Sequence, residues 1–417
     1  MSPDERRSIL AAIAETHGTP SYVYFLDEVQ ARVAALRSAF GARFEISYAV
    51  KSNPNPGLLA RLAGVVDALD VSSGGELALA IEAGWAASKV SFTGPAKRAP
   101  ELVAAVRHGT GEVVVESVSE ARELDAVAGQ AGVVQDVLVR IAPSQVPKGF
   151  GDSMAGKPVA FGIDEEVLAA SLDAVAACRN LRLRGFHIYS GTQCLQADAI
   201  VANYRIFLGL FERASEHLDI VPTKLIFGAG IGIPYHANQE SVDLEEVARH
   251  IVPELDAFKA KARYADAELV LETGRYLVGE AGVLLTRVVR TKTSRGGEIG
   301  ICDAGMNNQL AAAGHFGMVI KRNYPIEKIA SVHAPGEPRP YLLTGPLCTS
   351  IDTIGRGVTL DGLEANDLLG IGCSGAYGLT SSPMYFISHP LPREFVVEGD
   401  AAAPTVTEVT RPFGGYP

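Results

Sequence analysis

Short apolar runs rich in β-branched residues alternate with longer stretches of helical spacing between about residue 27 and residue 280. Eight runs have the length and composition of strands: EISYAV (45–50), DALDV (67–71), KVSFTG (89–94), EVVVES (112–117), DVLVRI (136–141), LRGFHIY (183–189), KLIFG (224–228) and ELVLE (268–272). Helices are predicted between them, over residues 75–83, 100–108, 118–128, 165–178, 198–217 and 243–262. Eight such units within about 250 residues favour an α/β fold closed into a (β/α)8 TIM-like barrel over an open doubly wound sheet.

The pattern changes after about residue 280, where short strands separated by turn residues predict an all-β domain, a sandwich or a barrel. The predicted strands are VLLTRVVRTKT (283–293), GEIGICDA (297–304), RPYLLTG (339–345), VTL (358–360), LLGIG (368–372), YFI (385–387) and REFVVEG (393–399). A short amphipathic helix at the N-terminus and the strand SYVYFLD (21–27) join this domain. The predicted domains are therefore a barrel over 26–280 and a β domain formed by 1–25 and 281–417.

The composition and net charge of the chain exclude some classes of function. The chain has 417 residues, is 47% hydrophobic and 20% charged, and has a net charge of −11. A general nucleic-acid binder needs a basic footprint, so that class is excluded. No apolar run approaches the roughly 20 residues of a membrane span, and the N-terminal segment lacks the apolar core of a signal peptide. We expect a cytoplasmic protein with no membrane partner.

The cysteines are scattered at Cys178, Cys194, Cys302, Cys348 and Cys373. None forms a CxxC pair, and nothing has the spacing of zinc ligands. We expect reduced thiols, most of them buried as small apolar groups, and no metal site.

Chemically unusual residues follow the ends of the predicted strands. They are Lys51, Asp70, Glu76, His187, Ser190, the glycines Gly228, Gly230 and Gly232, and Glu272, Gly274 and Arg275. Because the carboxyl ends of barrel strands meet on one face, where barrel enzymes keep their active sites, we expect these residues to converge.

Each of these residues also has an ordinary structural interpretation. Lys51 could be a surface lysine, although a lysine that enters a core face is costly unless it is paired or covalently used. The glycines of GAGIG (228–232) could serve a tight turn or expose backbone N–H groups to a phosphate. Glu272 and Arg275 could form a structural ion pair, and His187 could be a core histidine.

Eight motifs resemble, in order and over nearly the whole chain, those of the fold-type III decarboxylases that use pyridoxal 5′-phosphate (PLP). This family includes diaminopimelate decarboxylase and the eukaryotic-type ornithine decarboxylase. The motifs are YAVKSNPNP (48–56), DVSSGGEL (70–77), HIYSGTQ (187–193), GAGIG (228–232), ETGRYLVGEAG (272–282), DAGMN (303–307), GPLC (345–348) and GAYG (375–378). The resemblance implies a homodimeric PLP enzyme with shared active sites and a small amino-acid substrate.

The resemblance also implies a role for each motif. Lys51 matches the lysine that binds PLP covalently, His187 the histidine stacked on the pyridine ring, and Glu272 the acid at the pyridine nitrogen. Asp70 and Glu76 match polar residues around the cofactor. The implied phosphate ligands are Ser190, the loop Gly228, Ala229, Gly230, Ile231 and Gly232, and Arg275 and Tyr377, and Gly274 is a further expected cofactor-binding residue.

Cys348 matches the cysteine that reaches across the dimer interface to protonate the carbon that has lost CO2. Relatives follow this cysteine with Glu or Asp, which binds the distal ammonium of the substrate, whereas this chain has Thr349. Asp352 could substitute for that acid. Tyr377 is a further expected substrate contact. Diaminopimelate decarboxylases also carry an arginine after DAGMN for a distal carboxylate, and NQLAAAGHFGMVIKRNYP (308–325) has none at the matching place.

GPLCTSID, LAAAGHFG, KRNYP and SGAYGLTSSPMYFISHPLP resemble a subgroup from secondary metabolism and exosortase-associated gene clusters. One member, from butirosin biosynthesis, decarboxylates glutamate carried on an acyl-carrier protein. The resemblance therefore implies a PLP-dependent decarboxylase of an unusual or carrier-bound amino acid. The alternatives are a diaminopimelate decarboxylase, an amino-acid racemase, which the acid Glu272 disfavours, and a non-catalytic binding protein of the same fold.

Overall fold

The computed structural model describes residues 1–315 and 321–411, and the chain divides into two compact units. The barrel unit consists of Arg32–Ile233 and Glu240–Gly274. The β unit consists of Met1–Ala31, Pro234–Gln239 and the chain from Arg275 onward. The segment Pro234–Gln239 is thus grouped with the β unit, although it lies inside the predicted barrel range 26–280.

The barrel unit contains a closed ring of eight parallel strands, as the sequence predicts. The strands are β2 (Glu45–Ala49), β3 (Ala68–Val71), β4 (Val90–Phe92), β5 (Glu112–Val115), β6 (Gln135–Ala142), β9 (Leu181–Ile188), β11 (Lys224–Gly228) and β12 (Glu268–Thr273). They pair in the order β5-β4-β3-β2-β12-β11-β9-β6, and pairing of β5 with β6 closes the ring. Short additional strands are β7 (Asp152–Ser153), which pairs with β10 (Gly191–Thr192), and β8 (Ile163–Asp164), which extends β6.

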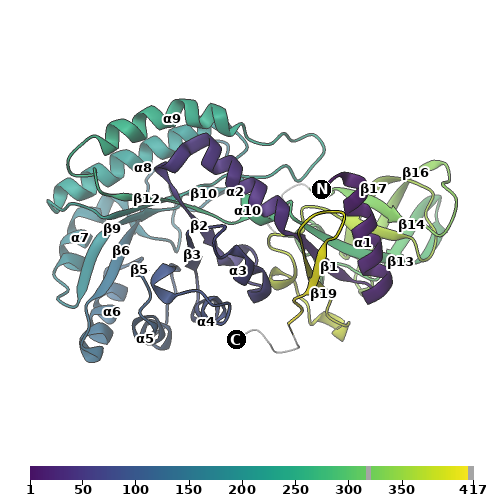
Figure 1. Cartoon of the computed structure of the whole chain (residues 1–417), viewed down its shortest axis with the longest axis horizontal. Coiled ribbons are helices and arrows are strands. Elements are labelled where there is room, and N and C mark those ends of the chain that lie inside the picture. The colour runs from purple at the N-terminus through teal and green to yellow at the C-terminus, as the bar shows by residue number, and fades with distance from the viewer. Residues whose placement is uncertain (316–320, 412–417) are drawn as a thin grey trace. The chain divides into compact units, whose positions relative to one another are not determined.

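Helices lie on the outside of these strands (Figure 1). They are α3 (Pro56–Leu62), α4 (Gly74–Glu82), α5 (Ala99–His108), α6 (Val118–Ala131), α7 (Leu168–Ala176), α8 (Ala197–His217) and α9 (Leu244–Lys259). Ser73, Ser117 and Asp243 begin α4, α6 and α9 by accepting the backbone N–H three residues further on. The predicted helices are confirmed, including the one over 165–178, which begins as a 3-10 turn at Glu165–Val167.

Apolar side chains fill the barrel and join it to its helices. Val114, Leu138, Ile226 and Val270 form a buried cluster from four strands. On the outer side, Phe227 of β11 packs against Phe211 of α8 with ring centroids 5.1 Å apart. Such packing fixes the strands, so the loops at their carboxyl ends are held in a defined arrangement.

The β unit contains a nine-stranded sheet. Its strands are β1 (Ser21–Phe25), β13 (Gly282–Ser294), β14 (Gly297–Cys302), β15 (Ile326–Ala330), β16 (Pro338–Thr344), β17 (Thr353–Asp361), β18 (Leu368–Ile371), β19 (Arg393–Glu398) and β20 (Thr405–Glu408). Helix α1 (Pro3–His17) buries Ile9, Leu10 and Ile13 against β1 and β19. Helix α2 (Leu26–Phe40) then runs into the barrel unit, and α10 (Arg275–Val278) follows β12.

One predicted strand in the β unit is wrong. YFI (385–387) is a bend followed by the 3-10 turn Phe386–Ser388, with positive φ at Ile387 and Ser388. Its three side chains are 43–54% exposed, so a strand here would bury no apolar surface that could stabilise it. The sequence reasoning also missed β15 and β20, which are short and carry charged residues.

Within the described ranges 1–315 and 321–411, no helix is long and apolar enough to cross a membrane. The same ranges hold no group of three or more His, Cys, Asp or Glu side chains that could bind a metal ion. All five cysteines are free thiols, and Cys348 is exposed.

Candidate active site

Lys51 lies between two buried carboxylates at the carboxyl end of the barrel. It sits on the 3-10 turn Val50–Ser52 that follows β2. Its Nζ is 3.4 Å from Glu272 Oε1 and 3.6 Å from Asp70 Oδ2, and both carboxylate side chains are 2% exposed. Strands β12, β2 and β3 are neighbours in the sheet, so pairing places these three side chains together. Lys51 is therefore a paired, partly buried amine, as the covalent interpretation requires, and not a surface lysine.

His187 completes this cluster from β9. Its Nε2 is 2.8 Å from Glu272 Oε2, and the ring is 1% exposed. Its other nitrogen, Nδ1, is buried with no hydrogen-bond partner in the described chain. The Lys51 amine also lies 5.5 Å from the centre of the Tyr189 ring, a contact that the sequence did not indicate.

The electrostatics separate the two carboxyl groups. Burial would raise the pKa of Glu272, but the Lys51 cation and the His187 hydrogen bond lower it to about 2. Burial and then the Glu272 charge raise the pKa of Asp70 well above its usual value. Burial lowers the pKa of His187. Glu272 is thus held as the ionised partner of the cluster at neutral pH.

Asp70 and Glu76 brace the turn after β3. The other oxygen of Asp70, Oδ1, accepts a hydrogen bond from the Thr93 hydroxyl of the loop after β4. Glu76 lies in the first turn of α4, and its carboxylate accepts the Ser72 N–H at 2.7 Å. Asp70 therefore faces Lys51 directly, whereas Glu76 shapes the loop beside it.

The loop after β11 carries the five residues predicted to bind a phosphate. Gly230 has φ 66°, which favours glycine, and a Cβ there would lie 2.6 Å from the Phe150 ring. The Ala229 N–H bonds to the Glu272 carbonyl and the Gly232 N–H to the Cys194 carbonyl. The N–H groups of Gly230 and Ile231 have no acceptor among residues 1–315 and 321–411, although both residues are buried.

The remaining predicted cofactor-binding residues of the barrel unit lie on buried loops. Ser190, after β9, donates its hydroxyl hydrogen to Asn203 Oδ1 on α8 at 2.7 Å. Gly274, after β12, packs against Ser52, because a Cβ there would lie 2.7 Å from the Ser52 hydroxyl oxygen. This close approach places Gly274 beside the turn that carries Lys51.

Arg275, at the start of the β unit, carries a partly buried charge against aromatic rings. Its Nη1 donates to the Tyr235 hydroxyl at 2.8 Å, and its guanidinium lies 4.7 Å from the centre of the Tyr377 ring. Its Nε is buried without an acceptor, and no carboxylate pairs with Arg275 within the described chain. The proposed ion pair with Glu272 is thus not formed. A partly buried guanidinium without a carboxylate partner is costly, so this arrangement fits an anionic ligand.

Sequence reasoning missed Tyr235 and Tyr324, whose tilted rings contact each other beside Arg275 with centroids 4.6 Å apart. Both lie in irregular segments, after GAGIG and in KRNYP, where no periodicity marks a buried tyrosine. It also missed Arg140 and Glu116, a buried ion pair at 3.1 Å in the barrel unit.

The Cys348 loop is clamped by Asp352. The carboxylate of Asp352 accepts the Met306 N–H at 2.7 Å and the Leu347 N–H at 2.8 Å, and the residue is 2% exposed. Burial raises the pKa of Asp352. Both oxygens of Asp352 thus hold backbone N–H groups of the loop, and the prediction that Asp352 binds a substrate ammonium stays a prediction. Thr349 is half-buried, and the Cys348 side chain is exposed beside it.

The barrel-unit residues fit PLP on two independent grounds. An amine beside an ionised carboxylate is the arrangement that a covalently held pyridine cofactor needs, because the carboxylate keeps the ring nitrogen protonated. Two buried N–H groups without acceptors at a glycine loop fit a phosphate, since buried backbone donors are almost always paired.

Comparisons with known proteins agree with this fit. Residues 26–279 match the model of the pyridoxal-dependent decarboxylase, pyridoxal binding domain family. The L-glutamyl-BtrI acyl-carrier protein decarboxylase of Niallia circulans is 34% identical over 93% of this chain and 90% of the relative. The diaminopimelate decarboxylase of Zymomonas mobilis is 30% identical over 94% of this chain and 91% of the relative.

A solved structure shows the same fold. The diaminopimelate decarboxylase of Helicobacter pylori, complexed with L-lysine, superposes with a TM-score of 0.83 at 27% identity, covering 96% of this chain and 95% of that one. The predicted barrel, the cofactor and the reaction class are thereby confirmed. The protein is an amino-acid decarboxylase that uses pyridoxal phosphate, and the chain belongs to the pyridoxal-dependent decarboxylase family.

Proposed function

We propose that this decarboxylase acts on an amino acid, glutamate, that is attached to an acyl-carrier protein. The proposal rests on one observation: the Asp352 carboxylate accepts hydrogen bonds from two backbone N–H groups of its own chain. With Asp352 bound to two backbone N–H groups and Thr349 neutral, the Cys348 loop offers no acid to a distal ammonium. The 34% identical relative is named for a glutamyl carrier-protein substrate, which has no such ammonium.

The point of attachment follows from the chemistry. Decarboxylation removes the α-carboxylate, and the α-amine must be free to react with the cofactor. A carrier can therefore be joined only through the side-chain carboxyl of glutamate. The proposed product is the corresponding amine, still attached to the carrier.

The proposed roles in the barrel unit follow the geometry. Lys51 binds the cofactor covalently and Glu272 pairs with the pyridine nitrogen. The Gly228–Gly232 loop binds the phosphate with the unpaired N–H groups of Gly230 and Ile231. Bound PLP supplies the electron sink that stabilises negative charge on the α-carbon. Arg275 and Tyr377 of the β unit remain proposed phosphate ligands, because the guanidinium is partly buried and has no carboxylate partner in the described chain.

The second candidate is a diaminopimelate decarboxylase, which the Zymomonas mobilis relative favours. The holoenzyme should be assayed for CO2 release from meso-diaminopimelate, free L-glutamate and glutamate joined to pantetheine through its side-chain carboxyl. The proposal expects the thioester to react with the highest kcat/KM. A faster reaction with meso-diaminopimelate would replace the proposal with this second candidate.

We also propose a homodimer in which Cys348 of one chain protonates the substrate bound to the other. The thiol is exposed on its own chain, which leaves it accessible to a partner. Cys348→Ala should lower kcat by about 10²-fold or more, the usual contribution of a general acid, and should change the distribution of products. The measurement is the rate of CO2 release together with product identification.

The control for this prediction is Cys178→Ala, which removes another partly accessible thiol outside the site and should leave kcat unchanged. If Cys348→Ala has neither effect, Cys348 is not the proton donor.

A further inference from the structure

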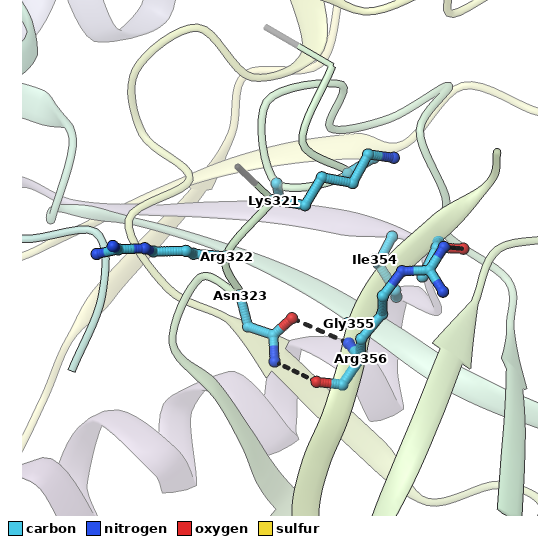
Figure 2. Close-up of a pocket in the computed structure, with 9 residues that line it drawn as sticks. Lys321, Arg322, Asn323, Ile354, Gly355 and Arg356 are labelled. Carbon is cyan, nitrogen blue, oxygen red and sulfur yellow. Dashed lines mark hydrogen bonds between the residues drawn. The ribbon is translucent and has the colours of Figure 1, made fainter. Parts of the chain in front are cut away.

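The β unit contains a basic pocket that the proposed catalytic roles do not use. The cavity measures about 270 Å³. It is lined by Ala312, Ala313, Lys321, Arg322, Asn323, Thr353, Ile354, Gly355 and Arg356. In Figure 2 the side chains of Lys321 and Arg356 extend toward the same side, whereas Arg322 points the opposite way. Two cationic side chains thus line this cavity and extend in a similar direction.

The pocket is built and not merely a gap between flexible side chains. Asn323 fixes the backbone of Arg356 with two hydrogen bonds: its Nδ2 donates to the Arg356 carbonyl at 2.8 Å, and its Oδ1 accepts the Arg356 N–H at 2.9 Å (Figure 2). The stem of Lys321 packs on Gly314, where a Cβ would lie 2.7 Å from Lys321 Cγ. These contacts fix the Arg356 backbone and the Lys321 stem, while the cationic ends of both exposed side chains stay open to a ligand.

No acidic residue lines this pocket, although the chain has a net charge of −11. In the described ranges, no carboxylate pairs with Lys321, Arg322 or Arg356, and residues 316–320 contain no Asp or Glu. Several other cations of the β unit do have a carboxylate partner, as Lys328 has Asp361 and Arg393 has Glu408. Burial and the Arg356 charge lower the pKa of Lys321. An anion in the pocket would relieve this repulsion.

The available donors match a phosphate group. Lys321 supplies a compact ammonium and Arg356 a planar fork of N–H groups, the two side chains that proteins use most for phosphate. The Thr353 hydroxyl lies 3.5 Å from Arg356 Nη2. Ala312 and Ala313 line the rest of the cavity with small apolar side chains.

The pocket is continuous with the loop that carries Cys348. Thr353 directly follows Asp352, the residue that clamps this loop. His315 Nε2 lies 3.0 Å from both the Ile351 carbonyl oxygen and Lys321 Nζ. A substrate that meets Cys348 can therefore extend past residues 349–353 to Lys321 and Arg356.

We propose that Lys321 and Arg356 bind the phosphodiester of the phosphopantetheine arm that joins the substrate to its carrier. The inference rests on the proposed function and names the part of the carrier that the enzyme recognises. A thioester of glutamate's side chain necessarily continues into this arm, and the phosphodiester is the arm's single anionic group.

Two substrates that differ only in the phosphate test the proposal. They are glutamate joined through its side-chain carboxyl to phosphopantetheine and to pantetheine. For the wild-type holoenzyme we expect a roughly 10- to 100-fold lower KM for the phosphorylated thioester, the scale of one or two charge-assisted hydrogen bonds. The double variant K321A/R356A should lose this preference and keep its kcat and its KM for the pantetheine thioester. Equal KM values for both thioesters in the wild type would overturn the proposal.

The control variant is Arg339→Ala, which removes one exposed positive charge from β16 of the same unit and should keep the preference. Calorimetric binding of phosphopantetheine without an amino acid separates this proposal from the proposed function. If neither thioester is decarboxylated but phosphopantetheine binds the wild type and not K321A/R356A, the proposed function fails and the phosphate site stands. Equal binding to the wild type and the double variant overturns the site.

Discussion

Lys51→Ala is expected to give a protein that lacks the visible absorption of covalently bound pyridoxal phosphate and has lost more than about 10³-fold in kcat. The Lys51 amine is the group that reaches both Asp70 and Glu272, and alanine leaves these two buried carboxyls without their cation. The cofactor would then have no amine to bind, and the electron sink would be lost with it. The measurements are the absorption spectrum after reconstitution and the rate of CO2 release.

The matched control is Lys89→Ala. Lys89 is an exposed lysine of the barrel unit, on the 3-10 turn before β4 and thus at the amino end of that strand. Its loss should change neither the spectrum nor the rate. A Lys51→Ala protein with the wild-type spectrum would show that another lysine holds the cofactor.

Glu272→Gln should separate binding of the cofactor from its activation. Glutamine keeps the shape of the side chain but carries no charge. Glu272 itself is ionised, because Lys51 and His187 lower its pKa to about 2. Without a negative partner the pyridine nitrogen loses its proton and becomes a weaker electron sink. We expect the spectrum of bound PLP to remain and kcat to fall by about 10²- to 10³-fold, the usual cost of one electrostatic stabiliser.

Glu268→Gln provides the control on the same strand. Glu268 begins β12 at the opposite end of the barrel and lies 3.7 Å from Lys224. This variant should retain its rate. If Glu272→Gln keeps the wild-type kcat, Glu272 is not needed to protonate the pyridine nitrogen, and it no longer distinguishes a decarboxylase from a racemase.

The barrel could be predicted because its signal is local. Each strand is an apolar run and each helix an amphipathic one, and the eight repeats leave few alternative folds. The same logic placed Lys51, Asp70, His187 and Glu272 at the carboxyl ends of their strands. Their convergence needs only the pairing of β3, β2, β12, β11 and β9, which the ring supplies.

Other parts of the site depend on contacts that no local pattern reveals. Asp352 looks like a free acid in the sequence, yet its partners are backbone N–H groups, one of them 46 residues away. The sequence predicts that Gly230 binds a phosphate. The positive φ and the nearby Phe150 ring give two further reasons for glycine at this position. YFI has the composition of a strand, but three exposed apolar side chains have no sheet to join.

The ionisation of the site is equally hidden from the sequence. Two carboxylates and a lysine on one face could pair in several ways. The structure places the lysine within 3.6 Å of both acids and adds His187 to Glu272 alone. The contacts with Lys51 and His187 lower the pKa of Glu272 against the effect of burial, whereas burial and then the Glu272 charge raise the pKa of Asp70.

We propose that this enzyme removes CO2 from glutamate whose side-chain carboxyl is attached to a carrier protein. The most direct test incubates the PLP-loaded enzyme with a glutamyl-loaded acyl-carrier protein and measures the mass of the loaded carrier. We predict that each phosphopantetheine arm loses one CO2, which leaves a 4-aminobutyryl thioester on the carrier. With Lys51→Ala the mass of the carrier should not change. An unchanged carrier mass, from an enzyme that releases CO2 from free meso-diaminopimelate, would contradict the proposal.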